Sequence, residues 1–208
     1  MPKKLQNNKP FPSLPRISQE NSYYCGPATV QMLCGFLGIE ISQNQVVRTV
    51  TTPKKVQQHG ITLEELGQAV NSLNLGVSFW VKRYASITEL SEIVNRYRFP
   101  VGVEWQGLFD YPDGEGYGDE DDDPGHIAVI VHVDTKKNEL LIVDPFEYYT
   151  KKDRFFTILE FERRWWDLNT VINPKTKKKE ETDDYHAMFV IIPKSENWPE
   201  RVGMRRYE

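Results

Sequence analysis

Both cysteines of the chain, Cys25 and Cys34, lie in one stretch, NSYYCGPATVQMLCGFLG. Apolar residues recur at a helical period from Gly26 onward, so this stretch predicts a single helix. The nine-residue separation of the thiols would span about 13 Å along a helix, whereas a disulfide needs Cα atoms within about 7 Å. A disulfide is therefore excluded, and zinc is disfavoured because structural zinc sites use closely spaced cysteine pairs with further ligands.

The two thiols are expected to differ in their surroundings. Cys25 lies where the helix begins, and the free N–H groups and positive dipole there favour a thiolate. Gly26 is expected to leave room for a substrate backbone. Cys34 lies in mid-helix, where a cysteine is typical of a small buried hydrophobic residue. Cys25 is therefore the candidate nucleophile.

A nucleophilic thiol needs a base and a group that orients the base. His126 opens the strongly apolar stretch HIAVIVHV directly after Pro-Gly, a position that can face a cleft. Asp144 closes the next apolar stretch, LLIVD, and a carboxylate there can hydrogen-bond the imidazole and favour its cation. The alternative is an ordinary turn-forming Asp before a proline.

Residues 126–133 and 140–144 predict a β-hairpin. His126 and Asp144 share a face of this hairpin only if its loop has an odd number of residues or a strand carries a β-bulge. An even loop without a bulge would place Glu147 opposite His126. Glu147 therefore stays the alternative orienting residue.

Helices are predicted mainly in the first half of the chain and strands mainly in the second. Capping boxes, which mark helix starts, occur at Ser42/Gln45, Thr62/Glu65, Ser86/Glu89 and Thr157/Glu160. Strands are predicted at residues 77–81, 100–105, 126–133, 140–144 and 187–193. This segregation predicts an α+β fold, with an N-terminal helical half packed on a mainly antiparallel β-sheet half.

Composition sets the expected domain organisation. Residues 1–18 are polar and proline-rich and predict an extended arm, residues 19–193 a single domain, and residues 194–208 a C-terminal tail. The net charge of −4 disfavours nucleic-acid binding. No membrane span, signal-peptide pattern or disulfide scaffold is indicated, so we expect a cytoplasmic protein of undetermined oligomeric state.

Two polar segments are expected to be surface insertions. Residues 109–125 are acidic and glycine-rich, and residues 173–184 are highly charged. The acidic segment is interpreted as a solvated loop. It could also steer a basic substrate, act as a lid or bind Ca²⁺, although its spacing does not match an EF-hand loop.

The stretches QENSYYCGPAT, PVGVEW, GHIAVIVHVD and LLIVDPF, in this order, resemble the bacteriocin-processing, double-glycine-leader cysteine peptidases of the papain-like superfamily. The resemblance implies a papain-like fold with Cys25 as nucleophile, His126 as general base and acid, and Asp144 orienting His126, without a metal or organic cofactor. It also implies that the Gln19 side-chain amide contributes to the oxyanion hole. The alternative for Gln19 is an exposed polar residue before a helix.

The sequence therefore predicts a cysteine peptidase that acts on a peptide or protein substrate. One alternative keeps the site but transfers the acyl group to an amine or thiol, as transglutaminase-like or phytochelatin-synthase-like enzymes do. The other is a catalytically silent peptide-binding module. The best-known members of the resembling family are part of ABC transporters, and no Walker A motif occurs in these 208 residues, so their substrates are not carried over.

Overall fold

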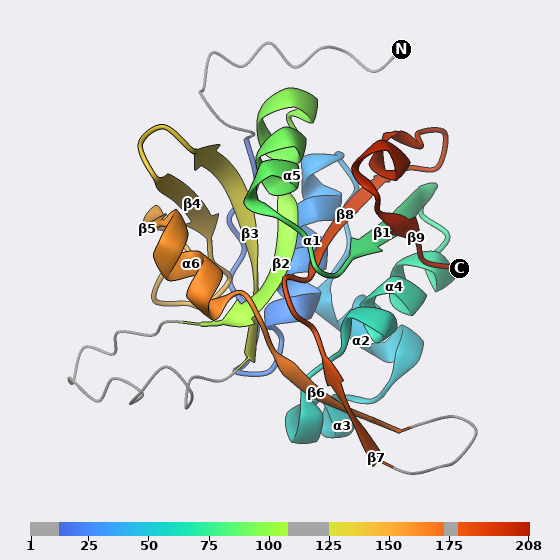
Figure 1. Cartoon of the computed structure of the whole chain (residues 1–208). Helices are drawn as coiled ribbons and strands as arrows, with labels where there is room; N and C mark the ends of the chain where they lie inside the picture. Colours follow the sequence, from blue (N-terminus) through green and yellow to red (C-terminus); the bar gives the residue numbers. More distant parts are fainter. Residues whose placement is uncertain (1–12, 108–124, 173–178) are drawn as a thin grey trace, which may run out of the picture.

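The computed structural model describes residues 13–107, 125–172 and 179–208. Within these residues, a seven-stranded antiparallel sheet has the strand order β5-β4-β3-β2-β8-β1-β9 (Figure 1). Its strands are β1 Val77–Lys82, β2 Val101–Gln106, β3 Gly125–Asp134, β4 Glu139–Val143, β5 Arg154–Thr157, β8 Met188–Pro193 and β9 Arg205–Arg206. A separate hairpin consists of β6 Leu168–Ile172 and β7 Lys179–Asp183.

Helices cover both faces of the sheet (Figure 1). One face carries α1 Cys25–Phe36, α2 Gln43–Val50 and α4 Leu63–Ser72, with α3 Pro53–His59 between the last two. The other face carries α5 Ile87–Ser91, the π-helix η1 Glu92–Tyr97, α6 Ile158–Arg164 and the 3₁₀ helix η2 Trp198–Val202. The predicted α+β class is confirmed, but the helices flank the sheet instead of forming one layer on it.

Each central strand contributes to two hydrophobic cores, because neighbouring residues of a strand point to opposite faces. In β3, Val129 packs in the core that contains α1 and α4, and Ile130 packs in the core that contains α5 and α6. The sheet is therefore buried on both faces. This explains why the β3 sequence is almost continuously apolar instead of alternating.

Local sequence signals locate most of these elements. The four predicted capping boxes form at the starts of α2, α4, α5 and α6. The five predicted strands agree with β1, β2, β3, β4 and β8 to within one residue at each end. These predictions are confirmed because caps and apolar runs act over a few neighbouring residues.

The charged segment 173–184, predicted as a surface insertion, is partly a strand. Residues 179–183 form β7 and pair with β6 in a hairpin separate from the main sheet. Residues 173–178 lie outside the described residues, as does the acidic segment 109–125 apart from Gly125, which begins β3. The polar sequence KEETD carries no strand signal, and its strand conformation depends on the pairing with β6.

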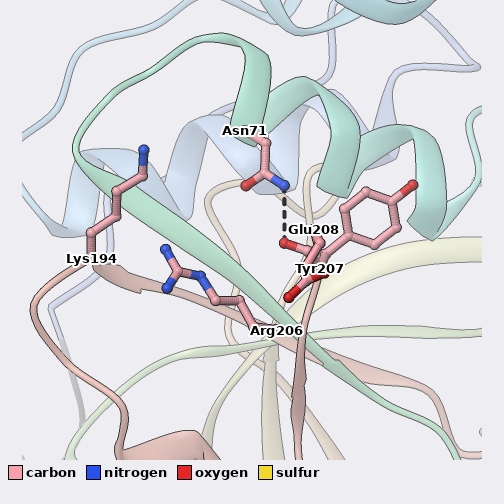
Figure 2. Close-up of a pocket in the computed structure, with 5 residues that line it drawn as sticks. All are labelled: Asn71, Lys194, Arg206, Tyr207 and Glu208. Atoms are coloured by element: carbon pink, nitrogen blue, oxygen red, sulfur yellow. Dashed lines mark hydrogen bonds between the residues drawn. The ribbon is translucent and has the colours of Figure 1, made fainter.

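Residues 194–208, predicted as a tail, instead belong to the folded domain. β9 pairs with β1 at the sheet edge, and Val202 and Met204 are buried in the core on the α5 face. The Asn71 side chain donates a hydrogen bond of 3.0 Å to the Tyr207 carbonyl and holds the chain end against α4 (Figure 2). Single apolar residues among charged ones form no periodic pattern, which is why the sequence did not indicate this packing.

Residues 13–18 of the predicted arm also contact the domain. Leu14 and Ile17 pack against the core that contains α1. Gly35 in α1 makes room for Pro15, because a Cβ at Gly35 would lie 2.8 Å from the Pro15 ring. The described part of the arm therefore has no regular secondary structure but packs against α1 and its core.

The buried position of Met204 gives a test of the C-terminal packing. Met204→Ala should lower the free energy of unfolding by about 2–5 kcal/mol, because it leaves a cavity in the core. Arg205→Ala, at the next and exposed position, should change it by less than about 0.5 kcal/mol. Urea unfolding measures both values. Equal midpoints for the two variants would show that residue 204 does not support the core.

Candidate active site

Cys25 is the first residue of α1 and is partly exposed. The N-cap residue, Tyr24, makes no side-chain capping bond to the first turn. The N–H groups of that turn are therefore not satisfied by a cap, and they add positive potential around the thiol. This is the helix-start position that the sequence predicted for the nucleophile.

The start of α1 is fixed closely against β3. One turn after Cys25, the buried Thr29 hydroxyl donates a hydrogen bond of 3.2 Å to the Ile127 carbonyl. A Cβ at Gly26 would lie 2.8 Å from Ile61 and 3.3 Å from Ile127. Gly26 therefore permits close packing of the helix start against Ile61 and β3, which is a reason for a glycine other than the room for a substrate backbone that the sequence suggested.

His126 contacts both predicted partners. Its ring is buried, with 4% exposed, and Nε2 lies 2.8 Å from Asp144 Oδ1. The thiol of Cys25 also forms a hydrogen bond with this ring. The structure thus brings together three residues from the start of α1, the start of β3 and the end of β4.

A register shift explains why His126 and Asp144 lie on one face. The loop 135–138 between β3 and β4 is even, which by itself would put the two side chains on opposite faces. β3 carries a bulge between Ile130 and His132, and the register changes there by one residue. The two side chains therefore share a face and meet as diagonal neighbours.

Asp144 is fully buried and makes bonds to several groups. Arg154 Nη1 lies 2.5 Å from Oδ2, and the Phe146 N–H donates to Oδ1 at 2.9 Å. Burial raises the pKa of a carboxyl group, but the charges and hydrogen bonds of His126 and Arg154 outweigh it and hold the pKa of Asp144 below its ordinary value. The alternative orienting residue, Glu147, is exposed.

Arg154 is a site residue that the sequence analysis missed. It begins β5, is buried, and its guanidinium lies 3.7 Å from the centre of the Tyr149 ring. The stretch KKDRFF contains nothing that distinguishes this arginine from the charged residues before it. Its role follows from the pairing of β5 with β4, which places it beside Asp144.

The charge of His126 follows from its surroundings. Burial lowers the pKa of the imidazole, but the charge and hydrogen bond of Asp144, with a further contribution from Cys25, raise it to about 10. His126 is therefore an imidazolium at neutral pH. Because this pKa exceeds the ordinary value of 6.5, the protonated ring adds fully to stability below pH 6.5, and this contribution is lost as the pH rises through about 10.

Gln19 lies beside the end of β4. Its backbone N–H donates to the Pro145 carbonyl at 2.8 Å, next in sequence to Asp144. Its side-chain Nε2 donates to the Asn21 carbonyl at 2.8 Å. The fourth predicted residue is thus linked to the same region as the other three.

The surroundings of the other cysteine and of two other histidines indicate structural roles. Cys34 is buried in the α1 core, and burial raises the pKa of its thiol to about 12. The His186 ring stacks on Trp165 and Tyr185. His132 is partly exposed near the far end of β3.

Residues 11–172 match the model of the Peptidase_C39 like family. The chain belongs to this family. No curated protein matches it. In the described residues, no helix has the length and apolar composition needed to cross a membrane.

Three solved structures of C39-type peptidases are similar to the chain. The peptidase domain of Streptococcus ComA, a bifunctional ABC transporter, is 17% identical with a TM-score of 0.55, covering 88% of this chain and 99% of that one. A double glycine motif protease from an AMS/PCAT transporter, in complex with the leader peptide, is 17% identical with a TM-score of 0.54 and coverages of 89% and 96%. A C39-like peptidase from Bacillus anthracis is 14% identical with a TM-score of 0.52 and coverages of 83% and 92%. The predicted papain-like fold is confirmed.

The imidazole of His126 can be titrated by NMR. In the wild-type protein its pKa should lie near 10, and in Asp144→Asn it should fall well below that value, because the charge of Asp144 no longer opposes the effect of burial. His126→Gln assigns the signal, because it removes the His126 resonance from those of the four histidines. A His126 pKa that stays near 10 in Asp144→Asn would contradict the assigned cause.

The Arg154 contact predicts a large effect on stability. Arg154→Met should lower the free energy of unfolding at pH 7 by about 3–5 kcal/mol, because it leaves a buried carboxylate with one cationic partner fewer. Arg163→Met, at an exposed position, is the matched control. Urea unfolding of both variants tests this, and equal losses would show that Arg154 does not support Asp144.

Proposed function

We propose that the protein is a cysteine peptidase that cleaves a peptide bond through an acyl-enzyme on Cys25. The observation that carries this proposal is the contact of His126 with both the Cys25 thiol and the Asp144 carboxylate. A raised imidazole pKa keeps His126 positively charged beside the thiol, and this charge favours attack by the sulfur as a thiolate.

In the first step the Cys25 thiolate attacks the carbonyl carbon of the substrate. The C–S bond forms while the C=O electron pair moves onto the oxygen. One N–H of the Gln19 amide goes to Asn21, so the second can donate to this oxyanion together with the backbone N–H of Cys25. The imidazolium of His126 then protonates the leaving amine as the C–N bond breaks.

In the second step water replaces the amine. Neutral His126 accepts a proton from the water, whose oxygen attacks the thioester carbonyl. The C–S bond breaks, the carboxylic acid product leaves, and the thiolate–imidazolium pair is restored. Asp144 keeps Nε2 of His126 engaged throughout, so that the other ring nitrogen faces the reacting atoms.

The substrate class follows from the family and its solved relatives. One similar structure holds a leader peptide. We extend to this chain only the chemistry of that ligand, a peptide segment whose backbone passes the thiol. The test substrates are therefore quenched-fluorescent peptides selected from a cleavage library.

Substitution of each cysteine separates the proposed nucleophile from its neighbour. Cys25→Ala should lower kcat on the order of 10⁵-fold, because it removes the nucleophile of a group that acts as a unit. Cys34→Ala should keep kcat within about twofold, since Cys34 lies in the core. Peptide cleavage measured by fluorescence gives both values.

Alkylation and isotope labelling sharpen the same experiment. Iodoacetamide should modify Cys25 first, and cleavage in H₂¹⁸O should add one ¹⁸O to the new carboxyl end. Preferential labelling of Cys34, or turnover in Cys25→Ala, would contradict the nucleophile. An amide product formed with an added amine in place of the ¹⁸O acid would identify acyl transfer instead.

A further inference from the structure

Gln19 lies in a segment without regular secondary structure. Residues 13–19 form neither helix nor strand. Such a segment samples many conformations unless other contacts hold it. An oxyanion donor, however, works only when it is held to about 0.5 Å of its productive position. The position of Gln19 therefore needs support from elsewhere in the fold.

Gln43, the first residue of α2, bonds the chain on both sides of Gln19. Its Oε1 accepts from the Glu20 N–H at 2.8 Å, and its Nε2 donates to the Ser18 carbonyl at 2.8 Å. In a parallel sheet, a residue bonds the neighbouring strand in the same pattern. It contacts the C=O of the residue before its partner and the N–H of the residue after its partner. The Gln43 amide thus acts as a strand partner for the backbone of Gln19.

The other edge of Gln19 is held at the same time. Its own N–H donates to the Pro145 carbonyl at 2.8 Å. Gln43 is only 1% exposed, so water does not replace its bonds if they are lost. The Gln19 backbone is therefore clamped between α2 and the residue that follows Asp144.

Gln43 is also connected to the helix of the nucleophile. Its Nε2 donates to Gln31 Oε1 at 3.1 Å, and Gln31 Nε2 donates to the Ile41 carbonyl at 2.7 Å. Because a carbonyl accepts only, these bonds admit one orientation of both amides. Gln31 belongs to α1, so this network joins the helix that begins at Cys25 to the Gln19 segment.

We propose that Gln43 is a positioning residue for the reaction, which holds Gln19 so that its amide meets the oxyanion. The inference rests on the proposed function, in which Gln19 is the donor. Gln43 acts through Gln19 and does not touch the substrate.

A double-mutant cycle with Gln19 tests this inference. Gln43→Met keeps the side-chain length but removes the three bonds, and kcat on the library peptide should fall by about 10- to 100-fold. Gln19→Ala should cost about 10²- to 10³-fold. In the Gln19→Ala background, Gln43→Met should lower kcat by less than about a further twofold, because the amide that Gln43 positions is already absent.

Two controls distinguish positioning from general damage. Iodoacetamide alkylation of Cys25 forms no oxyanion, so its rate should stay at the wild-type value in Gln43→Met. Gln45→Met changes the same residue type in the same helix at an exposed position that bonds Ser42, and it should keep the wild-type kcat. Gln43→Glu is a second variant of equal size, which retains the acceptor for Glu20 but loses the N–H donors, and it should also lower kcat without slowing alkylation.

Each failure has its own signature. Three results would overturn the role of Gln43 alone. They are an unchanged kcat in both Gln43 variants, an undiminished effect of Gln43→Met on kcat in the Gln19→Ala background, and alkylation that slows in parallel with kcat. Unchanged kcat in Gln19→Ala, or turnover in Cys25→Ala, would overturn the proposed function itself.

Discussion

The fold around the site depends on the burial of one carboxylate, that of Asp144. A charge with no exposed surface is stable only if cationic or hydrogen-bonding groups surround it. Here His126 bonds one oxygen and Arg154 the other. The three residues come from β3, the end of β4 and β5, which are neighbours in the sheet. The burial of Asp144 therefore depends both on the pairing of the three strands and on the positive charge of the His126 imidazole.

The nucleophile joins this arrangement from the opposite layer. Because the sheet is buried on both faces, β3 is rigid enough to present His126 while α1 packs against its other side. The Thr29 bond to Ile127 and the absence of a side chain at Gly26 bring the helix start to that strand. The peptidase chemistry that we propose needs this contact between layers, since neither layer holds both groups.

The elements that the sequence predicted correctly are those determined by interactions between residues close in the chain. Capping boxes and apolar strands were predicted because a few adjacent residues determine them. β5, β6, β7 and β9 were not, because they are short or polar and their conformation depends on partners far along the chain. The docking of residues 194–208 escaped prediction for the same reason, as its apolar residues are single and widely spaced.

The sequence by itself determined the order and types of the candidate residues, from Gln19 and Cys25 to His126 and Asp144. It left open whether Asp144 or Glu147 faces the histidine, because the parity of a hairpin depends on its loop and its bulges. The tertiary structure decided this with an even loop and a bulge in β3. Only the tertiary structure brought Arg154 and Gln43 to the site, because hydrogen bonds between distant segments leave no local pattern in the chain.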